Sequence, residues 1–268
     1  MYRLKISIYL MALTLALTLG KINAVSAATE AEIHSWVVPA PRHTKETYFS
    51  NLSDGASIET PFVVRFGLSG MGLAAITGSV PDTGHHHLLV NRELPANFQQ
   101  PLPFNDSYIH FGKGQMETVL LFKPGTYTLR LVLANQGHIP YFVYSKPVTI
   151  TVTKRNDAID PKSLVTKEIK ILSPLDGSSV RAPFRIGFHA SGFNVSHLSA
   201  PDAGSGHFRL RMQPNNGAEV VMDFKNGHTE TWLNPPVGHY TARLDLIDNT
   251  KSGSVLATST PVKIDVKR

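Results

Sequence analysis

Apolar and polar residues alternate along much of the chain, and this alternation predicts β-strands. Between residues 127 and 133 a tyrosine or leucine stands at every second position, with threonine, arginine and valine between them. A period of two residues is typical of a half-buried strand. Residues 62–66 and 148–152 form further short runs rich in β-branched and aromatic residues, and no long helical period follows residue 27. The pattern therefore predicts an all-β protein.

The same succession of runs occurs twice, because two stretches of about a hundred residues resemble each other. Three pairs of segments carry the correspondence: 51–57 with 173–179, 125–127 with 238–240, and 147–152 with 261–266. Glycine and proline separate the runs at the spacing of a β-sandwich. We therefore expect two tandem immunoglobulin-like β-sandwich domains, a first copy at residues 48–153 and a second copy at residues 169–268.

The sequence before Tyr127 is Pro-Gly-Thr, which resembles the tyrosine corner of immunoglobulin-like folds, where the phenol bonds back to the chain. A simple core tyrosine would be equally consistent with this sequence. Two further segments lie outside the copies. Residues 28–47 contain Pro39 and Pro41 and are expected to be an extended lead-in. Residues 154–168 are charged and turn-like, which is typical of a linker.

The first residues have the pattern of a secretory signal peptide. Arg3 and Lys5 form a basic start, residues 6–19 are mainly apolar, and Val25-Ser26-Ala27 fits the small-residue cleavage rule. An apolar run of 14 residues is shorter than the roughly 20 residues that a membrane span needs. We therefore expect cleavage after residue 27, a periplasmic or secreted protein, and no membrane span after cleavage. The alternative is an uncleaved anchor.

Charge and cysteine content exclude several classes of function. The net charge is +6, but residues 1–27 hold three basic residues and no acidic one, which leaves +3 for the remaining chain. Because no dense basic patch with interleaved aromatic residues occurs, nucleic-acid binding is not supported. The chain has no cysteine. Disulfides, thiolate metal sites and cysteine nucleophiles are therefore excluded.

The strongest chemical signal is the triplet His85-His86-His87, followed by the apolar run Leu88-Leu89-Val90. In a strand, neighbouring side chains point to opposite faces, so His85 and His87 share one face. If the other face is the core, these two histidines point outward. Imidazole is a ligand that suits zinc, copper, iron and nickel. A strand end that is merely hydrogen-bonded, without a metal, is the alternative.

The duplication provides an internal control, because residues that the fold needs should occur in both copies. Aligned by sequence, the two copies pair as follows: His85-His86-His87 with Ser205-Gly206-His207, His110 with Asp223, Glu117 with Glu230, and residues 135–138, which end in His138, with the region of residues 248–251. On this alignment His85, His110 and His138 are dispensable for the fold, which favours a functional role. His87 and Glu117 have counterparts, so they could be structural in both copies and bonded to each other.

We therefore predict a metal site in the first copy, with its ligands drawn from His85, His87, His110, His138 and Glu117. Imidazole and carboxylate ligands without cysteine suit Zn(II) or Cu(II). A catalytic version would require an open coordination position and a base, for which Glu117 is the candidate. Since protons compete for imidazole, metal affinity is expected to weaken below about pH 6. The second copy should bind nothing comparable.

A family resemblance rests on the same residues. The segments 84–90 and 110–118, together with 61–68 and 138–140, resemble the domain-of-unknown-function family numbered 4399. The resemblance covers residues 48–153, and residues 169–268 are a degenerate second copy. It implies an exported, histidine-rich β domain, and it assigns no activity.

Three functions compete at this stage. The first is an exported protein that binds Cu or Zn through the histidine cluster, for sequestration or delivery. The second is a non-enzymatic envelope module in which two β-sandwiches present a surface to an envelope protein or polymer. The third, a metal-dependent hydrolase or oxidase, ranks last, because the sequence contains neither Gly-x-Ser-x-Gly nor His-Glu-x-x-His.

Overall fold

The computed structural model describes residues 34–42 and 44–268. The expected signal peptide at residues 1–27 lies outside the described residues. Both copies belong to one structural unit, which spans residues 33–268. Within the described part of the chain, no helix is long and apolar enough to cross a membrane.

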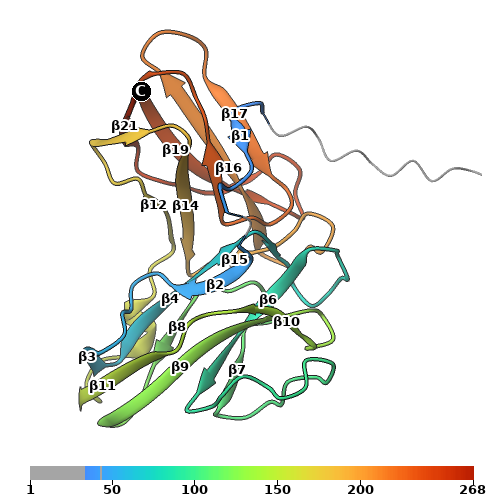
Figure 1. The fold of residues 1–268 in the computed structure, drawn as a ribbon, viewed down its shortest axis with the longest axis vertical. Helices are drawn as coiled ribbons and strands as arrows, with labels where there is room; N and C mark the ends of the chain where they lie inside the picture. The colour runs from blue at the N-terminus through green and yellow to red at the C-terminus, as the bar shows by residue number, and fades with distance from the viewer. Residues whose placement is uncertain (1–33, 43) are drawn as a thin grey trace, which may run out of the picture. The chain divides into compact units, whose positions relative to one another are not determined.

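The first copy consists of two packed β-sheets (Figure 1). The larger sheet has the order β3 (Ala56–Thr60), β11 (Val148–Arg155), β9 (Gly125–Ala134), β6 (Thr83–Val90) and β5 (Gly72–Leu73), with β10 (Pro140–Tyr144) added to β9 and β7 (Tyr108–His110) added to β6. The smaller sheet has the order β2 (Glu46–Phe49), β4 (Phe62–Ser69) and β8 (Glu117–Leu120). Alternate residues of both sheets, among them Val64, Phe66, Leu88, Leu129 and Leu131, face inward and form the core.

The second copy repeats this arrangement. Its larger sheet has the order β13 (Ser178–Arg181), β21 (Val262–Lys267), β19 (Gly238–Asp248), β16 (Ser205–Pro214) and β15 (Asn194–Val195), with β17 (Val220–Phe224) added to β16 and β20 (Val255–Thr258) added to β19. The smaller sheet has the order β1 (Val37–Val38), β18 (Glu230–Leu233), β14 (Phe184–Ser191) and β12 (Glu168–Ser173). Between the copies lies a short 3₁₀ helix, η1 (Pro161–Leu164).

The prediction of two tandem immunoglobulin-like β-sandwiches is confirmed. In each copy two sheets pack face to face, and the strand that begins with the Gly-x-Tyr sequence, β9 or β19, carries a tyrosine corner. The Tyr127 hydroxyl donates a hydrogen bond to the carbonyl oxygen of Lys123 at 3.0 Å. The Tyr240 hydroxyl does the same to Pro236 at 2.7 Å. Both tyrosines therefore bond back four residues, as this motif requires.

The lead-in connects the two copies. Strand β1 pairs with β18 of the second copy, with Val37 opposite Leu233. A few residues later, β2 pairs with β4 of the first copy, with Glu46 opposite Ser69. The part of the lead-in that the structure describes is thus hydrogen-bonded into both sandwiches.

The copies also contact each other through a pair of reciprocal backbone hydrogen bonds. The amide of Leu73 donates to Gly227 at 2.9 Å, and the amide of Val195 donates to Gly114 at 2.9 Å. Both glycines have positive φ, at +75° and +82°. A Cβ on Gly114 would lie 1.8 Å from the Val195 carbonyl oxygen, and one on Gly227 would lie 2.1 Å from that of Leu73. Glycine is therefore required at both positions by conformation and by space.

Candidate metal centre

His85 and His87 lie side by side on β6. In the strand ladder they stand opposite Ala134 and Val132 of β9, so their side chains leave the same face of the sheet. Their Nε2 atoms are 3.0 Å apart. The shared face that the alternation predicts is therefore present, and it brings two imidazole nitrogens together.

His110 reaches this pair from the neighbouring strand. It ends β7, directly opposite His87 in the ladder, and its ring centroid lies 4.7 Å from that of His85. The next turn leaves space for the ring, because a Cβ on Gly112 would lie only 2.3 Å from the Cε1 atom of His110. The glycine at this position therefore permits the orientation of the histidine.

His138 completes the group from the turn after β9. It has a positive φ of 62°, which is uncommon for a residue other than glycine. The turn is held by Asn135, whose side-chain oxygen accepts hydrogen bonds from the amides of Gly137 and Ile139. The Nδ1 atom of His138 lies 3.3 Å from Nε2 of His85.

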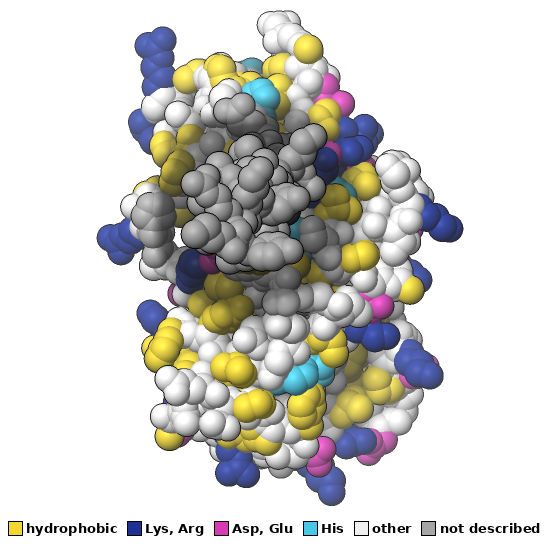
Figure 2. All heavy atoms as spheres, turned by 90° about the vertical axis from the view of Figure 1, so that its right-hand side faces the viewer, with side chains coloured by type: hydrophobic (Ala, Val, Ile, Leu, Met, Phe, Trp, Pro, Cys, Tyr) yellow, Lys and Arg dark blue, Asp and Glu magenta, His cyan; other side chains and the backbone are white. Residues whose placement is uncertain are grey.

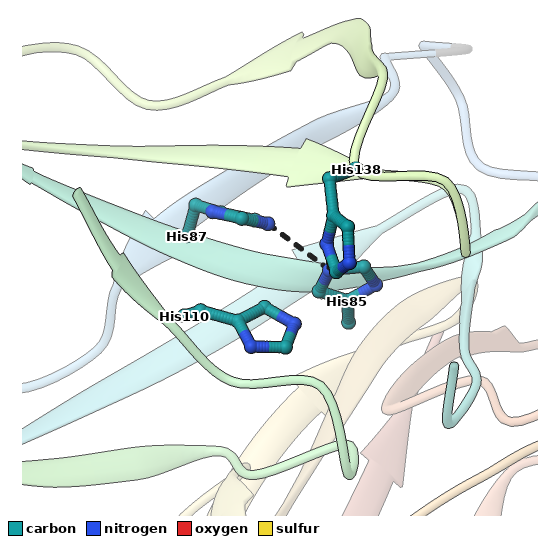
Figure 3. A group of neighbouring side chains, drawn as sticks. All are labelled: His85, His87, His110 and His138. Carbon is teal, nitrogen blue, oxygen red and sulfur yellow. Dashed lines mark hydrogen bonds between the residues drawn. The ribbon is translucent and has the colours of Figure 1, made fainter. Parts of the chain in front are cut away.

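Figure 3 shows the four histidine rings turned toward a common point. Each of His85, His87, His110 and His138 offers one nitrogen atom, and these four nitrogens all lie within 4.8 Å of one another. Metal–nitrogen bonds of 2.0–2.1 Å in tetrahedral geometry place neighbouring nitrogens about 3.3 Å apart. The 3.0 and 3.3 Å separations approach this value. Small ring movements would bring the remaining nitrogens to it.

The expectation that His85 and His87 point outward is wrong. Only 1% of His85 and none of His87 is exposed, whereas His110 and His138 are partly buried. The face that carries them is a second small core, formed by Leu89, Leu102 and residues of β9. Residues 91–107, which connect β6 to β7, supply Leu102. Figure 2 shows histidine side chains at the surface beside hydrophobic ones. Because His110 and His138 are only partly buried, the group is screened without being sealed.

Burial keeps these imidazoles neutral. It lowers the pKa of His85 to about 2, together with repulsion from the positive charges of neighbouring imidazoles. Burial also lowers the pKa of His87 to about 3. The pKa values of His110 and His138 are lowered for the same reason. Competition by protons is thus weaker than the ordinary imidazole pKa implies, and the nitrogen lone pairs are available in mild acid.

Several buried ring nitrogens in this group have no hydrogen-bond partner among the described residues: Nδ1 of His85, Nδ1 of His87 and Nε2 of His110. Hydrogen bonds normally satisfy such groups, and leaving one unsatisfied costs roughly 1–3 kcal/mol. His86 and His207 each have one such nitrogen as well, so the convergence of the four rings, and not the unpaired nitrogens, sets this group apart.

Glu117 does not belong to this group. Its carboxylate accepts hydrogen bonds from Ser191 at 2.5 Å and from His189 Nε2 at 3.1 Å, both in the second copy. Burial would raise its pKa, but these hydrogen bonds, together with the charges of His189 and Arg65, lower it. The expected partner, His87, is not bonded to it. Glu117 is instead part of the contact between the copies, which removes it from the set of candidate ligands.

The counterpart of Glu117 explains why both copies retain this residue. Glu230 of the second copy accepts hydrogen bonds from Ser69 and Tyr48 of the first copy, each at 2.6 Å. Each copy thus contributes one buried glutamate that is bonded by the other copy. The sequence identified the recurrence, but the partners lie more than seventy residues away and carry no local signal.

His86 points to the opposite face, as predicted, and it is packed in the core. Its ring lies 5.4 Å from that of Phe66, and its Nδ1 atom is 3.1 Å from the Thr47 hydroxyl. Because this hydroxyl donates to the Gly67 carbonyl oxygen, Nδ1 of His86 must carry the proton. His86 is therefore a structural histidine.

The structure corrects the alignment of the two copies by two residues. Gly84 and Gly206 occupy equivalent positions, because the carbonyl oxygen of each accepts a 2.9 Å hydrogen bond from the residue after β5 or β15. A Cβ on either would lie 2.6 Å from a carbonyl oxygen of the neighbouring strand, that of Ala134 in β9 or that of Ile247 in β19. The sequences Thr-Gly-His and Ser-Gly-His at these glycines would have given the correct alignment.

On the corrected alignment, the first histidine of the triplet is the one that has a counterpart. The equivalent pairs are His85 with His207, His86 with Phe208, His87 with Arg209 and His110 with Asp223. The second copy therefore retains one of the four histidines of the candidate site.

Comparison with protein families gives one match. A family model described as "Domain of unknown function (DUF4399)" matches residues 64–153 and 186–267, which are parts of the two copies. A search of the curated proteins found no match.

Solved structures with similar arrangements include fibronectin-type modules. One is the fibronectin(III)-like modules of Clostridium thermocellum CbhA, 12% identical, covering 82% of this chain and 92% of that chain with a TM-score of 0.25. Another is a two-domain fibronectin type III segment of chicken tenascin, 13% identical, covering 82% of this chain and 95% of that chain with a TM-score of 0.21. Because these TM-scores are low, the assignment of the β-sandwich architecture rests on the strand pairing described above.

Proposed function

We propose that this protein, which belongs to the DUF4399 family, binds a divalent transition-metal ion through His85, His87, His110 and His138. The observation that supports the proposal most is the convergence of four imidazole nitrogens within 4.8 Å. The lowered pKa values of these rings support it further, because a metal requires the neutral form.

The chemistry of the donors narrows the choice of metal. Four neutral imidazoles suit Zn(II) and Cu(II), whereas sites selective for Cu(I) are usually rich in sulfur ligands. With four protein ligands and no carboxylate in the group, the site resembles a binding centre more than a catalytic one, which keeps a position open. The proposed role is therefore sequestration or delivery of Zn(II) or Cu(II), in the periplasm or outside the cell if residues 1–27 direct export.

The test is metal analysis of the chain purified without an affinity tag. About one equivalent of Zn(II) or Cu(II) per chain is expected to bind, since one group of this kind is present among the described residues. The paired variant His85→Ala with His110→Ala should lose it. The matched control is His207→Ala, because His207 occupies the position of His85 in the second copy. An unmodified chain that binds neither metal, or a paired variant that binds as well, would rule the proposal out.

A surface of the first copy favours the second candidate, a non-enzymatic envelope module. Phe142 is 78% exposed and its ring stacks on Phe98 at 4.4 Å, and the ring of Tyr144 lies 6.3 Å from that of Phe98. An exposed aromatic group of this kind is typical of contact with a protein or a polymer.

The hydrolase or oxidase hypothesis has lost its candidate base, since Glu117 is bonded to the second copy.

A further inference from the structure

The connection between β6 and β7 differs most between the two copies. In the first copy it comprises residues 91–107, whereas the equivalent connection between β16 and β17 comprises only residues 215–219. The long connection therefore occurs in the copy that carries the four histidines. Because hairpin connections of two to five residues are usual, a connection of this length is typically functional or mobile.

This connection is attached to the sheet at several points. Leu102 is buried against Leu89 and the end of β9. Its backbone amide donates a 2.9 Å hydrogen bond to the carbonyl oxygen of His138. Near its start, Glu93 forms an ion pair with Arg130 of β9. The connection thus lies over the face that carries His85 and His87, and it is bonded directly to one of the four histidines.

Two residues beyond Leu102, the ring of Phe104 packs against the histidine group. Its centroid lies 4.6 Å from that of His138 and 5.1 Å from that of His110, both edge-to-face. It also lies 6.3 Å from the ring of His87. Phe104 is nevertheless 58% exposed. One side of its ring therefore contacts imidazoles, while the other side is exposed to solvent. The ring thus covers the histidine group although its own apolar surface remains exposed.

We propose that Phe104 and the connection 91–107 form a cover over the histidine group that slows exchange of the bound metal ion. This inference rests on the proposed function. His110 and His138 are the histidines that remain partly exposed, so an ion or an incoming ligand approaches on their side. Phe104 occupies that side. A hydrophobic residue around a metal site limits access of water and of competing ligands.

A cover of this kind acts on rates more than on affinity. Phe104 has no metal-binding atom, so it adds no bond to the ion, and its displacement is required equally for entry and for exit. Removing the ring should therefore raise both rate constants by similar factors. The site would then exchange metal faster at nearly the same dissociation constant.

The test is a stopped-flow measurement on the full chain loaded with Zn(II). Release to an excess of the chromogenic chelator 4-(2-pyridylazo)resorcinol gives the dissociation rate constant, and mixing free protein with Zn(II) gives the association rate constant. Phe104→Ala should raise both by about tenfold or more, with the dissociation constant within about threefold of the original. Because Phe104 is largely exposed, the variant should remain folded, which circular dichroism checks.

Two further variants make the outcome specific. Phe104→Leu keeps much of the apolar volume and should restore slow exchange in part. Phe122→Ala removes an aromatic ring that stacks on Tyr127, away from the histidines, and should exchange metal at the original rate. Release that is unchanged in Phe104→Ala overturns the cover and leaves metal binding intact. A rise in dissociation alone would also overturn it, since Phe104 would then stabilise the bound ion. If the original chain binds no Zn(II), both the proposed function and the cover fail.

Discussion

Equivalent positions of the β-sandwich carry different groups of side chains in the two copies. In the first copy, four imidazoles converge without a carboxylate. In the second copy, Arg209 and Asp223 take the positions of His87 and His110 and form two hydrogen bonds, at 2.6 and 2.9 Å. His207, at the position of His85, is bonded through Nδ1 to Asn249 at 2.7 Å.

The difference shows how a β-sandwich can either close such a site or leave it available. The second copy pairs a cation with an anion across β16 and β17, so Arg209 and Asp223 satisfy each other within the protein. In the first copy no such pair stands at these positions, and four imidazoles with lowered pKa values converge instead. Because a metal ion binds the lone pairs of neutral imidazoles, the first copy offers it a set of donors that the second copy does not.

The largest expected effect is the increase in stability that Zn(II) gives when it binds to the first copy. Zn(II) at a free concentration of one hundred times its dissociation constant should raise the free energy of unfolding by about 2.7 kcal/mol, because only the folded chain presents the site. Urea unfolding with and without Zn(II) measures this. The paired variant His85→Ala with His110→Ala should show no such increase, while His207→Ala should keep it. An equal increase in the paired variant would place the metal elsewhere.

A slightly smaller effect is expected from breaking the ion pair of the second copy. Asp223→Ala leaves the partly buried Arg209 without its partner and should lower the free energy of unfolding by about 2 kcal/mol. The equivalent change in the first copy, His110→Ala, should cost less than about 1 kcal/mol in metal-free protein. Denaturant unfolding of both variants in the presence of a chelator provides the comparison. If His110→Ala lowers the free energy of unfolding more than Asp223→Ala does, the histidines stabilise the fold.

The stability that Glu117 contributes should depend on pH in acid. The folded-state pKa of Glu117 is lowered, so its hydrogen bonds contribute stability above the ordinary carboxyl pKa of 4.5, and this contribution is lost as pH falls through the lowered value. Glu117→Gln should cost about 1.5 kcal/mol at neutral pH. It should also flatten the pH dependence of unfolding below pH 4.5. An unchanged acid profile would show that Glu117 does not carry this dependence.

The smallest expected effect is a gain of weak metal binding by the second copy. Arg209→His with Asp223→His, placed in the His85→Ala and His110→Ala background, would give the second copy three histidines together with His207. Weak Zn(II) binding should appear, about a hundredfold weaker than in the first copy, because the fourth ligand is missing and Asn249 already holds His207. Isothermal titration calorimetry would detect it. Complete absence of binding would show that the backbone of the first copy supplies more than the ligand positions.

Much of the fold could be predicted from the sequence because its signals are local. Alternation at residues 127–133 identified a strand, and the repeated segments identified the duplication. The four histidines lie close together, and for His85 and His87 this follows from strand geometry, which places them on one face. Their burial could not be predicted, because it depends on where residues 91–107 lie. The role of Glu117 was missed for a similar reason, as its partners His189 and Ser191 belong to the other copy.

The reciprocal bonds at Gly114 and Gly227 have a consequence for how the two copies can diverge. Each copy offers the same pair of groups to the other, which is the arrangement of a symmetric homodimer joined into one chain. In a homodimer of identical subunits, any substitution appears in both partners at once. In a tandem chain, one half can exchange its histidines for an ion pair while the other half keeps them. The covalent link thus preserves the symmetric association and frees the two sites to specialise separately.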